Sequence, residues 1–269
     1  MRIIPFAIST VVTVGLVTVL SMKWGPAPPF GKFLSPQQGF WQNAEPVDKD
    51  FSADLKFPGL KGKANVYFDE RLVPHVFADN DDDAYFIQGY LHAKFRLWQM
   101  EFQTLATAGR ISEVIGDRAI NYDREQRRMG LTFAAENMVK AMEANPQTRS
   151  AVNSYTAGVN AWISHLTESE LPVEYKLLDY KPEQWSNLKT ALFVKQLTKT
   201  LAGYGYGNDF QYTSLLSVFS DDEIKMLFPY VPDSLSPIIP KGTVYPEPTS
   251  VAVKPGNSDS AYLKKTDSL

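Results

Sequence analysis

The sequence predicts an α+β fold that is mainly helical, with one short pair of strands. Within residues 63–101, two short β-rich runs give way to the 3.6-residue spacing of a long amphipathic helix. Several downstream stretches repeat the helical spacing. Hydrophobic residues make up 44% of the 269 residues and charged residues 21%, which is ordinary for a globular protein with a sizeable core.

The N-terminus is apolar enough to cross a membrane. Ile3 to Met22 contains no charged residue and lies between Arg2 and Lys23. A helix of roughly 20 residues spans the hydrocarbon core of a bilayer, whereas the apolar part of a cleavable signal peptide usually has only ~7–15. Residues 1–24 are therefore expected to be an uncleaved membrane anchor, with a long signal peptide as the alternative. In both cases the rest of the chain is expected to be exported, either to the periplasm or anchored facing it or the exterior.

The next segment, residues 25–54, is punctuated by Pro and Gly and is expected to be an extended linker. Its aromatic side chains are expected either at the membrane interface or docked on the folded domain; they are Phe30, Phe33, Phe40 and Trp41. Residues 55–230 form the expected folded body. Residues 231–269 are rich in Pro with little periodicity, which is typical of a spacer.

The body begins with two β-rich runs, Lys63–Phe68 and Leu72–Phe77, which predict a hairpin or a bent strand pair. Pro74 cannot donate a ladder hydrogen bond, so it indicates an edge, a bulge or a strand start. Asn80 or Asp81 is expected to cap the long helix that follows.

This long helix, which Gly109 ends, is apolar on nearly all sides and is therefore expected to be buried. One narrow row of its side chains is polar: Gln88, His92, Arg96, Gln99 and Gln103. Five further helices are expected, at Tyr122–Met142, Gln147–Leu166, Ser186–Ala202, Asp209–Phe219 and Asp221–Phe228.

Composition excludes several kinds of function. The absence of cysteine excludes disulfides, thiolate metal sites and cysteine nucleophiles, and a net charge of -3 without a basic stripe argues against nucleic acid as a partner. The three histidines, His75, His92 and His165, are not at metal-ligand spacing and are expected to be structural or exposed. No glycine-rich phosphate loop or hydrolase elbow is present, so no organic cofactor and no catalytic residue are assigned.

The glycine-rich stretch Gly203–Gly207 leads to Asn208 and Asp209. Either residue is suited to cap the next helix, and the same geometry would turn a carboxylate toward a cation. The residues themselves favour the cap.

A series of motifs in fixed order resembles the first part of the penicillin acylase (penicillin amidase) family. The resemblance extends over about residues 60–219 and rests on Phe68–Glu70, Val73–Ala78, Gln88–Tyr90, Arg96–Glu101, Gly109–Gly116, Tyr155–Trp162 and Pro172–Trp185. It implies an N-terminal-nucleophile hydrolase with an αββα fold, cut into a helical α subunit, a spacer and a β subunit. The first serine of the β subunit would be the nucleophile, and its free amine, which titrates near neutrality, the base.

The sequence departs from the family because no Ser-Asn-x-Trp type of β-subunit start is found in it. Ser258 is the best in-chain substitute, but a spacer serine is the favoured interpretation of this residue. The resemblance therefore implies a leader, an α-subunit portion and part of a spacer. The nucleophile and the oxyanion hole would belong to a β subunit of the same precursor or of an adjacent gene. This chain alone is expected to be inactive, and residues 51–230 alone poorly soluble.

Two site assignments follow from the resemblance by position. Leu197 and Leu201 fall where the family lines the acyl pocket, and Thr200 falls where some members carry an arginine that meets a substrate carboxylate. Loss of that charge makes aliphatic acyl amides, including acyl-homoserine lactones, at least as suitable as β-lactams. Asp209, or alternatively Asn208, falls near a carboxylate that helps some members to bind a structural Ca²⁺.

The function expected from this resemblance is the α-subunit part of an amidohydrolase that splits a small acylated amine at its amide bond. The alternative is a non-catalytic, membrane-anchored helical protein that uses the same surface to bind a partner.

Overall fold

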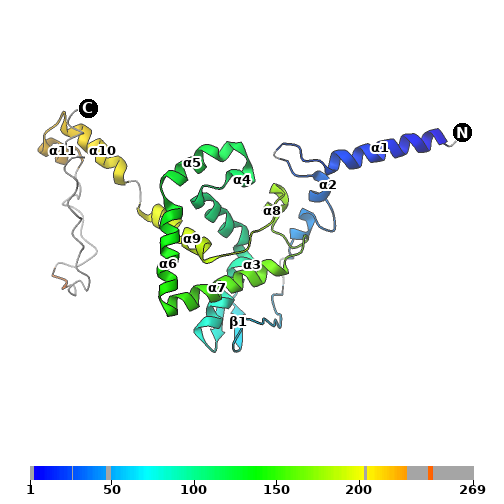
Figure 1. Ribbon diagram of the computed structural model, residues 1–269, viewed down its shortest axis with the longest axis horizontal. Coiled ribbons are helices and arrows are strands. Elements are labelled where there is room, and N and C mark those ends of the chain that lie inside the picture. The colour runs from blue at the N-terminus through cyan, green and yellow to red at the C-terminus, as the bar shows by residue number, and fades with distance from the viewer. Residues whose placement is uncertain (1–2, 26, 47–49, 203–204, 229–241, 245–269) are drawn as a thin grey trace. The chain divides into compact units, whose positions relative to one another are not determined.

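The structure of the protein is a computed structural model that describes residues 3–25, 27–46, 50–202, 205–228 and 242–244 (Figure 1). The chain forms two compact units, Met1–Gly203 and Tyr204–Leu269, which are described separately. The first unit is mainly helical and contains a two-stranded sheet. This is the α+β fold that the sequence predicts.

The long helix α3, Asp81–Ala108, is the centre of the first unit. The Asn80 side chain accepts a hydrogen bond from the Asp83 backbone N–H at its N-terminus, and Gly109 ends it in the left-handed conformation with φ 65°. Half of its residues are buried, as the nearly all-round apolar pattern predicts. The predicted cap and end are both confirmed.

Helix α7, Pro146–His165, packs along α3 (Figure 1). The two backbones approach closely at a pair of glycines. A Cβ added to Gly89 would collide with the carbonyl oxygen of Tyr155, and one added to Gly158 would collide with that of Phe86. Hydrogen at these Cα positions therefore sets the distance between the two helices.

The strands β1, Ala64–Phe68, and β2, Pro74–Ala78, form an antiparallel hairpin with Val66 opposite Val76. Pro74 starts its strand, which is one of the positions predicted for it. The inward side chains of the hairpin pack on the N-terminal half of α3. The outward rings of Tyr67 and Phe77 are each 61% exposed and meet edge to face, with centroids 5.9 Å apart.

The helix predicted at Tyr122–Met142 is instead two helices, α5, Ile120–Arg128, and α6, Leu131–Ala144. Gly130 separates them because it adopts φ 68°, a conformation that ends a right-handed helix and that glycine reaches without strain. The short helix α8, Val173–Leu178, was not expected from the sequence. The remaining elements of this region are α4, Ser112–Ile115, η2, Asp117–Ala119, and α9, Asn187–Ala202.

The second unit contains α10, Gly205–Leu216, and α11, Asp221–Leu227. Helix α10 begins at Gly205, earlier than the predicted Asp209, so Gly205 and Gly207 lie in its first turn and not in a loop. The cap predicted at Asn208 or Asp209 is therefore wrong. In α11, Ser220 and Glu223 form a reciprocal capping box.

Three elements precede the body: α1, Ile3–Ser21, α2, Phe30–Phe33, and η1, Phe40–Asn43. Helix α1 has a mean hydropathy of 2.3 and no buried residue, so its length and composition suffice to cross a membrane. A signal sequence has the same properties.

A buried carboxylate joins the last helices of the first unit to α3. Glu101 is 1% exposed, and its Oε2 accepts a hydrogen bond from the Tyr175 hydroxyl at 2.7 Å. Its Oε1 accepts from the backbone N–H of Glu183 at 2.7 Å and pairs with the Lys189 ammonium at 3.1 Å. Lys189 also reaches Glu183 at 3.0 Å. The carboxylate thus has every oxygen satisfied, which buried charges require.

The pKa values of the surrounding groups follow from this arrangement. Hydrogen bonds from Arg110, reinforced by Lys189, lower the pKa of Glu183 to about 2. Burial, together with the adjacent Glu101 carboxylate, raises the pKa of the Tyr175 hydroxyl, so Tyr175 stays a hydrogen-bond donor. Glu183 is therefore ionised at neutral pH, and Tyr175 is neutral.

We expect Lys189→Met to destabilise the complete protein by about 3–5 kcal/mol, because it leaves the Glu101 carboxylate buried without its countercharge. Lys181→Met is the control: Lys181 pairs with Glu168 on the surface and is 72% exposed, so the change should cost less than about 1 kcal/mol. Thermal unfolding of the two variants measures the difference. Equal shifts in the two variants would show that the Glu101 network contributes no more than a surface ion pair.

Candidate functional site

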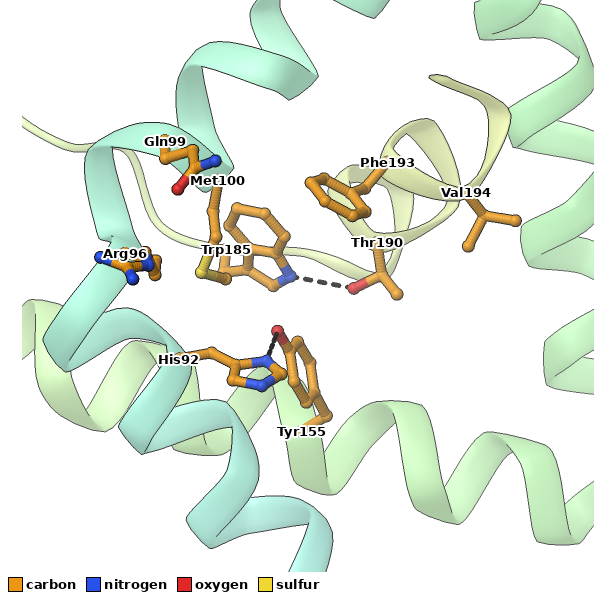
Figure 2. A pocket seen from close by; sticks show the side chains of 9 residues that line it. All are labelled: His92, Arg96, Gln99, Met100, Tyr155, Trp185, Thr190, Phe193 and Val194. Atoms are coloured by element: carbon orange, nitrogen blue, oxygen red, sulfur yellow. Dashed lines mark hydrogen bonds between the residues drawn. The ribbon is translucent and has the colours of Figure 1, made fainter. Parts of the chain in front are cut away.

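A cavity of about 400 Å³ lies between α3, α7 and α9 of the first unit (Figure 2). Its wall on α3 includes three residues of the narrow polar row. The lining residues are His92, Arg96, Gln99, Met100, Tyr155, Trp185, Thr190, Phe193 and Val194. Polar side chains of α3 thus face apolar side chains of α9 and of the loop before it.

Two hydrogen bonds hold the lining side chains in place, and both are drawn in Figure 2. His92 Nδ1 and the Tyr155 hydroxyl lie 3.1 Å apart, and the Trp185 indole N–H donates to the Thr190 hydroxyl at 2.9 Å. Asn160 fixes the backbone of Trp185 by accepting from its N–H at 2.7 Å and donating to its carbonyl at 3.0 Å. Four of the lining side chains are therefore held in place: His92, Tyr155, Trp185 and Thr190.

Helix α3 is kinked where it passes the cavity. Arg96 has φ −142° and ψ 16°, which lies outside the helical region. Its guanidinium makes a long contact of 3.5 Å with the carbonyl oxygen of Phe95. Among the residues that the structure describes, no carboxylate lies within 4 Å of it. The kink thus places an unpaired cation at the edge of the cavity.

The hydrogen-bonded pair carries no charge at neutral pH. Burial lowers the pKa of His92 from its usual 6.5, although part of the side chain stays exposed, and burial raises the pKa of Tyr155 to about 12. Both changes disfavour the ionised forms. The cavity thus offers an apolar surface, a neutral imidazole–phenol pair and one guanidinium.

The sequence contained a signal for this site, and His92 is exposed, which is one of the two outcomes expected for it. The signal is the polar row itself, since a helix that is otherwise apolar on all sides has no packing reason to keep one. The kink at Arg96 had no such signal, because neither Pro nor Gly marks it.

The predicted acyl-pocket residues lie on α9, beyond the cavity. Leu197 and Leu201 follow Phe193 at intervals of four residues, so the three share one face of the helix. Leu197 is 52% exposed and Leu201 is 77% exposed. Thr200 is also exposed, and its hydroxyl donates to the carbonyl oxygen of Gln196 at 3.0 Å. An exposed apolar stripe thus runs from the cavity wall along α9.

Asp209 lies in the first half of α10, in the second unit, and its side chain is outside the described residues. Within the described part of the chain, no cluster of three His, Cys, Asp or Glu side chains is placed to hold a metal ion.

Comparison with known proteins finds a similar fold in a penicillin acylase and shows the family of the chain. The structure of a thermostable penicillin G acylase from Alcaligenes faecalis matches with a TM-score of 0.53 and 23% identity, over 70% of this chain and 100% of that chain; at this identity the likeness shows the fold alone. A family model described as penicillin amidase matches residues 63–262, which is more than half of the sequence. The chain belongs to the penicillin amidase family.

Individual relatives carry names from two groups of acylases. The chain is 33% identical to "Penicillin acylase 2 proenzyme" of Pseudomonas sp. (strain SE83), over 54% of this chain and 18% of that protein. It is 32% identical to "Acyl-homoserine lactone acylase QuiP" of Pseudomonas aeruginosa, over 66% of this chain and 21% of that protein. It thus spans about a fifth of the length of these curated relatives.

We expect His92 to titrate below pH 6.5 in the complete protein, because burial disfavours the imidazolium. Tyr155→Ala should raise the midpoint toward 6.5 by admitting water to the ring. Tyr85→Ala, at an exposed position of the same helix, should leave it unchanged. NMR of protein labelled at histidine, assigned with His92→Gln, measures the midpoint. A midpoint above 6.5 would show that an acidic group, and not burial, governs this histidine.

Proposed function

We propose that this chain is the α-subunit part of an amidohydrolase that splits the linear amide bond between an acyl group and an amine, and that α9 forms one wall of the acyl pocket. The observation that carries the proposal is the stripe Phe193, Leu197 and Leu201, which is exposed on α9 and begins at the wall of the cavity. Large apolar side chains that remain exposed in a row mark a surface that binds a ligand or another protein.

The chemical step is assigned to a serine outside the described cavity. The hydroxyls that line the cavity belong to Tyr155 and Thr190. Tyr155 is held neutral by burial, and Thr190 accepts the Trp185 hydrogen bond without a base beside it. A nucleophile needs an adjacent base, which this arrangement does not supply. We therefore assign the nucleophile and its amine base to a β subunit, as the family resemblance implies, and expect this chain alone to be inactive.

The proposed substrate is a small acylated amine with an aliphatic acyl group. Leu201 follows Phe193 after eight helical steps, or about 12 Å along the helix, which suits an extended chain better than a compact ring. Thr200 replaces the arginine that would meet a carboxylate near this stripe. Relatives named as acyl-homoserine lactone acylases and as penicillin acylases are both compatible with this choice.

The location that we propose is outside the cytoplasm. Residues 3–22 supply an apolar segment that is long enough either to anchor the protein in a membrane or to direct its export. The body would then act in the periplasm or at the membrane surface facing it.

The acyl-pocket assignment predicts a loss of transition-state binding when the stripe is shortened. In the enzyme expressed from its complete gene, Leu197→Ala or Leu201→Ala should lower kcat/KM for an aliphatic acyl amide by about tenfold or more, since each lost methylene is worth ~1 kcal/mol. Leu177→Ala, which alters an exposed leucine on α8, is the control. Residues 1–269 alone should show no turnover.

Two outcomes would contradict this proposal. Turnover by residues 1–269 alone would place the nucleophile within the chain. A complete gene product that hydrolyses no amide, yet still binds a partner through α9, would favour the non-catalytic membrane-anchored binding protein.

We also propose that Asp209 supplies one ligand of a structural Ca²⁺, with Asn208 as the alternative. Ca²⁺ takes six to eight oxygen ligands, so the others must come from additional groups, including the β subunit. Metal analysis of the complete protein should find calcium, and Asp209→Ala should lower its content and the melting temperature. Glu223→Ala alters an acid of the capping box and should leave the calcium content unchanged. A metal-free wild-type protein that melts at the same temperature with and without Ca²⁺ would contradict this assignment.

A further inference from the structure

The segment between α1 and the body is folded in large part, although residues 25–54 were expected to form an extended linker. Phe33 stacks on Phe40 with ring centroids 5.2 Å apart, and Phe40 contacts Trp41 at 4.3 Å. Gly39 packs so closely that an added Cβ would collide with the carbonyl oxygens of Phe33 and Ser35. We call residues 30–43 the clasp.

The clasp is fixed to α8 through a buried lysine. Lys176 is 6% exposed, and its ammonium donates to the Gly39 carbonyl at 3.0 Å, to Asn43 Oδ1 at 2.9 Å and to the Ser169 carbonyl at 2.9 Å. All three donors of the ammonium are therefore used, two of them by the clasp. Asn43 returns a hydrogen bond from its amide to the Leu171 carbonyl at 2.9 Å.

A second contact lies at the other end of the clasp. The Lys32 ammonium pairs with Asp179 at 3.3 Å and with Glu168 at 3.5 Å. These charges are partly exposed, so they orient the segment more than they stabilise it. Because the segment touches the body at both ends, it cannot act as a loose tether.

The clasp also follows α1 closely. The Trp24 indole N–H donates to the Val19 carbonyl at 3.0 Å, and Gly31 lies against Leu20 at the end of α1. If residues 25–54 were fully extended, they would separate the membrane helix from the body by up to roughly 100 Å. The first contact with the body is made by Lys32, and the residues between Ser21 and Lys32 can span at most about 40 Å. Folded structure that contacts the body therefore begins at α2, shortly after the apolar helix ends at Ser21.

We propose that residues 24–43 dock on the surface of a lipid bilayer that α1 spans, so that the clasp holds the body at the membrane. Trp24, Phe30 and Trp41 are 52%, 41% and 57% exposed, and aromatic side chains of this kind favour the headgroup region. The segment contains no Asp or Glu that anionic headgroups would repel. This inference rests on the proposed membrane location of residues 3–22 and is independent of the amidase activity.

The first test asks whether the clasp holds the body in native membranes. Vesicles from cells that express the complete gene are treated with trypsin, and cleavage after Lys32 is followed by mass spectrometry. We expect Asn43→Ala and Lys176→Met to speed this cleavage at least tenfold and to release the body, with unchanged melting temperature for Asn43→Ala. Lys140→Met, which alters an exposed lysine of α6, should behave as wild type.

The second test asks whether the aromatic side chains enter the lipid. In vesicles that contain brominated phospholipids, Trp41→Phe should remove part of the quenchable tryptophan fluorescence, and Trp185→Phe, at a buried position, should not. The proposal is overturned if the mature protein begins after residue 24, because α1 is then cleaved. It is also overturned if trypsin cleaves the Asn43→Ala variant after Lys32 at the wild-type rate. Unchanged quenching in the Trp41→Phe variant would overturn it as well, because Trp41 would then not enter the lipid.

Discussion

The buried carboxylate of Glu101 is the constraint on which the first unit depends. Leaving it unpaired would cost several kcal/mol, so the chain must bring Tyr175, the Glu183 backbone and Lys189 to the same place. These three groups come from α8, from the loop that follows it and from α9. A polar interaction in the C-terminal half of α3 thus determines where the last elements of the unit lie, and apolar packing fills the space around it.

The same helix serves the candidate site, and the two roles use different faces. Glu101 faces inward to the network, whereas His92, Arg96 and Gln99 line the cavity. The non-helical conformation of Arg96 lies within the cavity-lining row, between His92 and Gln99. Such irregular backbone persists only where the surroundings hold it, here by the packing of α3 on α7.

The sequence predicts those parts of the fold that depend on local chemistry. Asn80 as a cap, Pro74 as a strand start and Gly109 as a helix end all follow from side-chain or backbone preferences of single residues. Features that depend on the conformation chosen in context were missed. Gly130 is compatible with a continuous helix and breaks it only because its φ is positive, and α8 is defined by contacts of Tyr175 and Lys176 that are distant in sequence. The acyl-pocket positions on α9, Leu197 and Leu201, were predicted from the family resemblance. Helical periodicity could not have predicted them, because it indicates that these leucines are buried, whereas the structure shows them exposed.

The glycine contact between α3 and α7 bears on how the substrate range of such a protein can change. Gly89 and Gly158 bring backbone against backbone, so the distance between the two helices that carry His92 and Tyr155 of the cavity is fixed. The opposite wall, on α9, is built from Phe193 and Val194, whose side chains can be exchanged one at a time. Under the acyl-pocket assignment that we propose, substitutions on α9 would change the acyl group that is accepted, whereas the two glycines would have to be retained together to keep α3 and α7 in place.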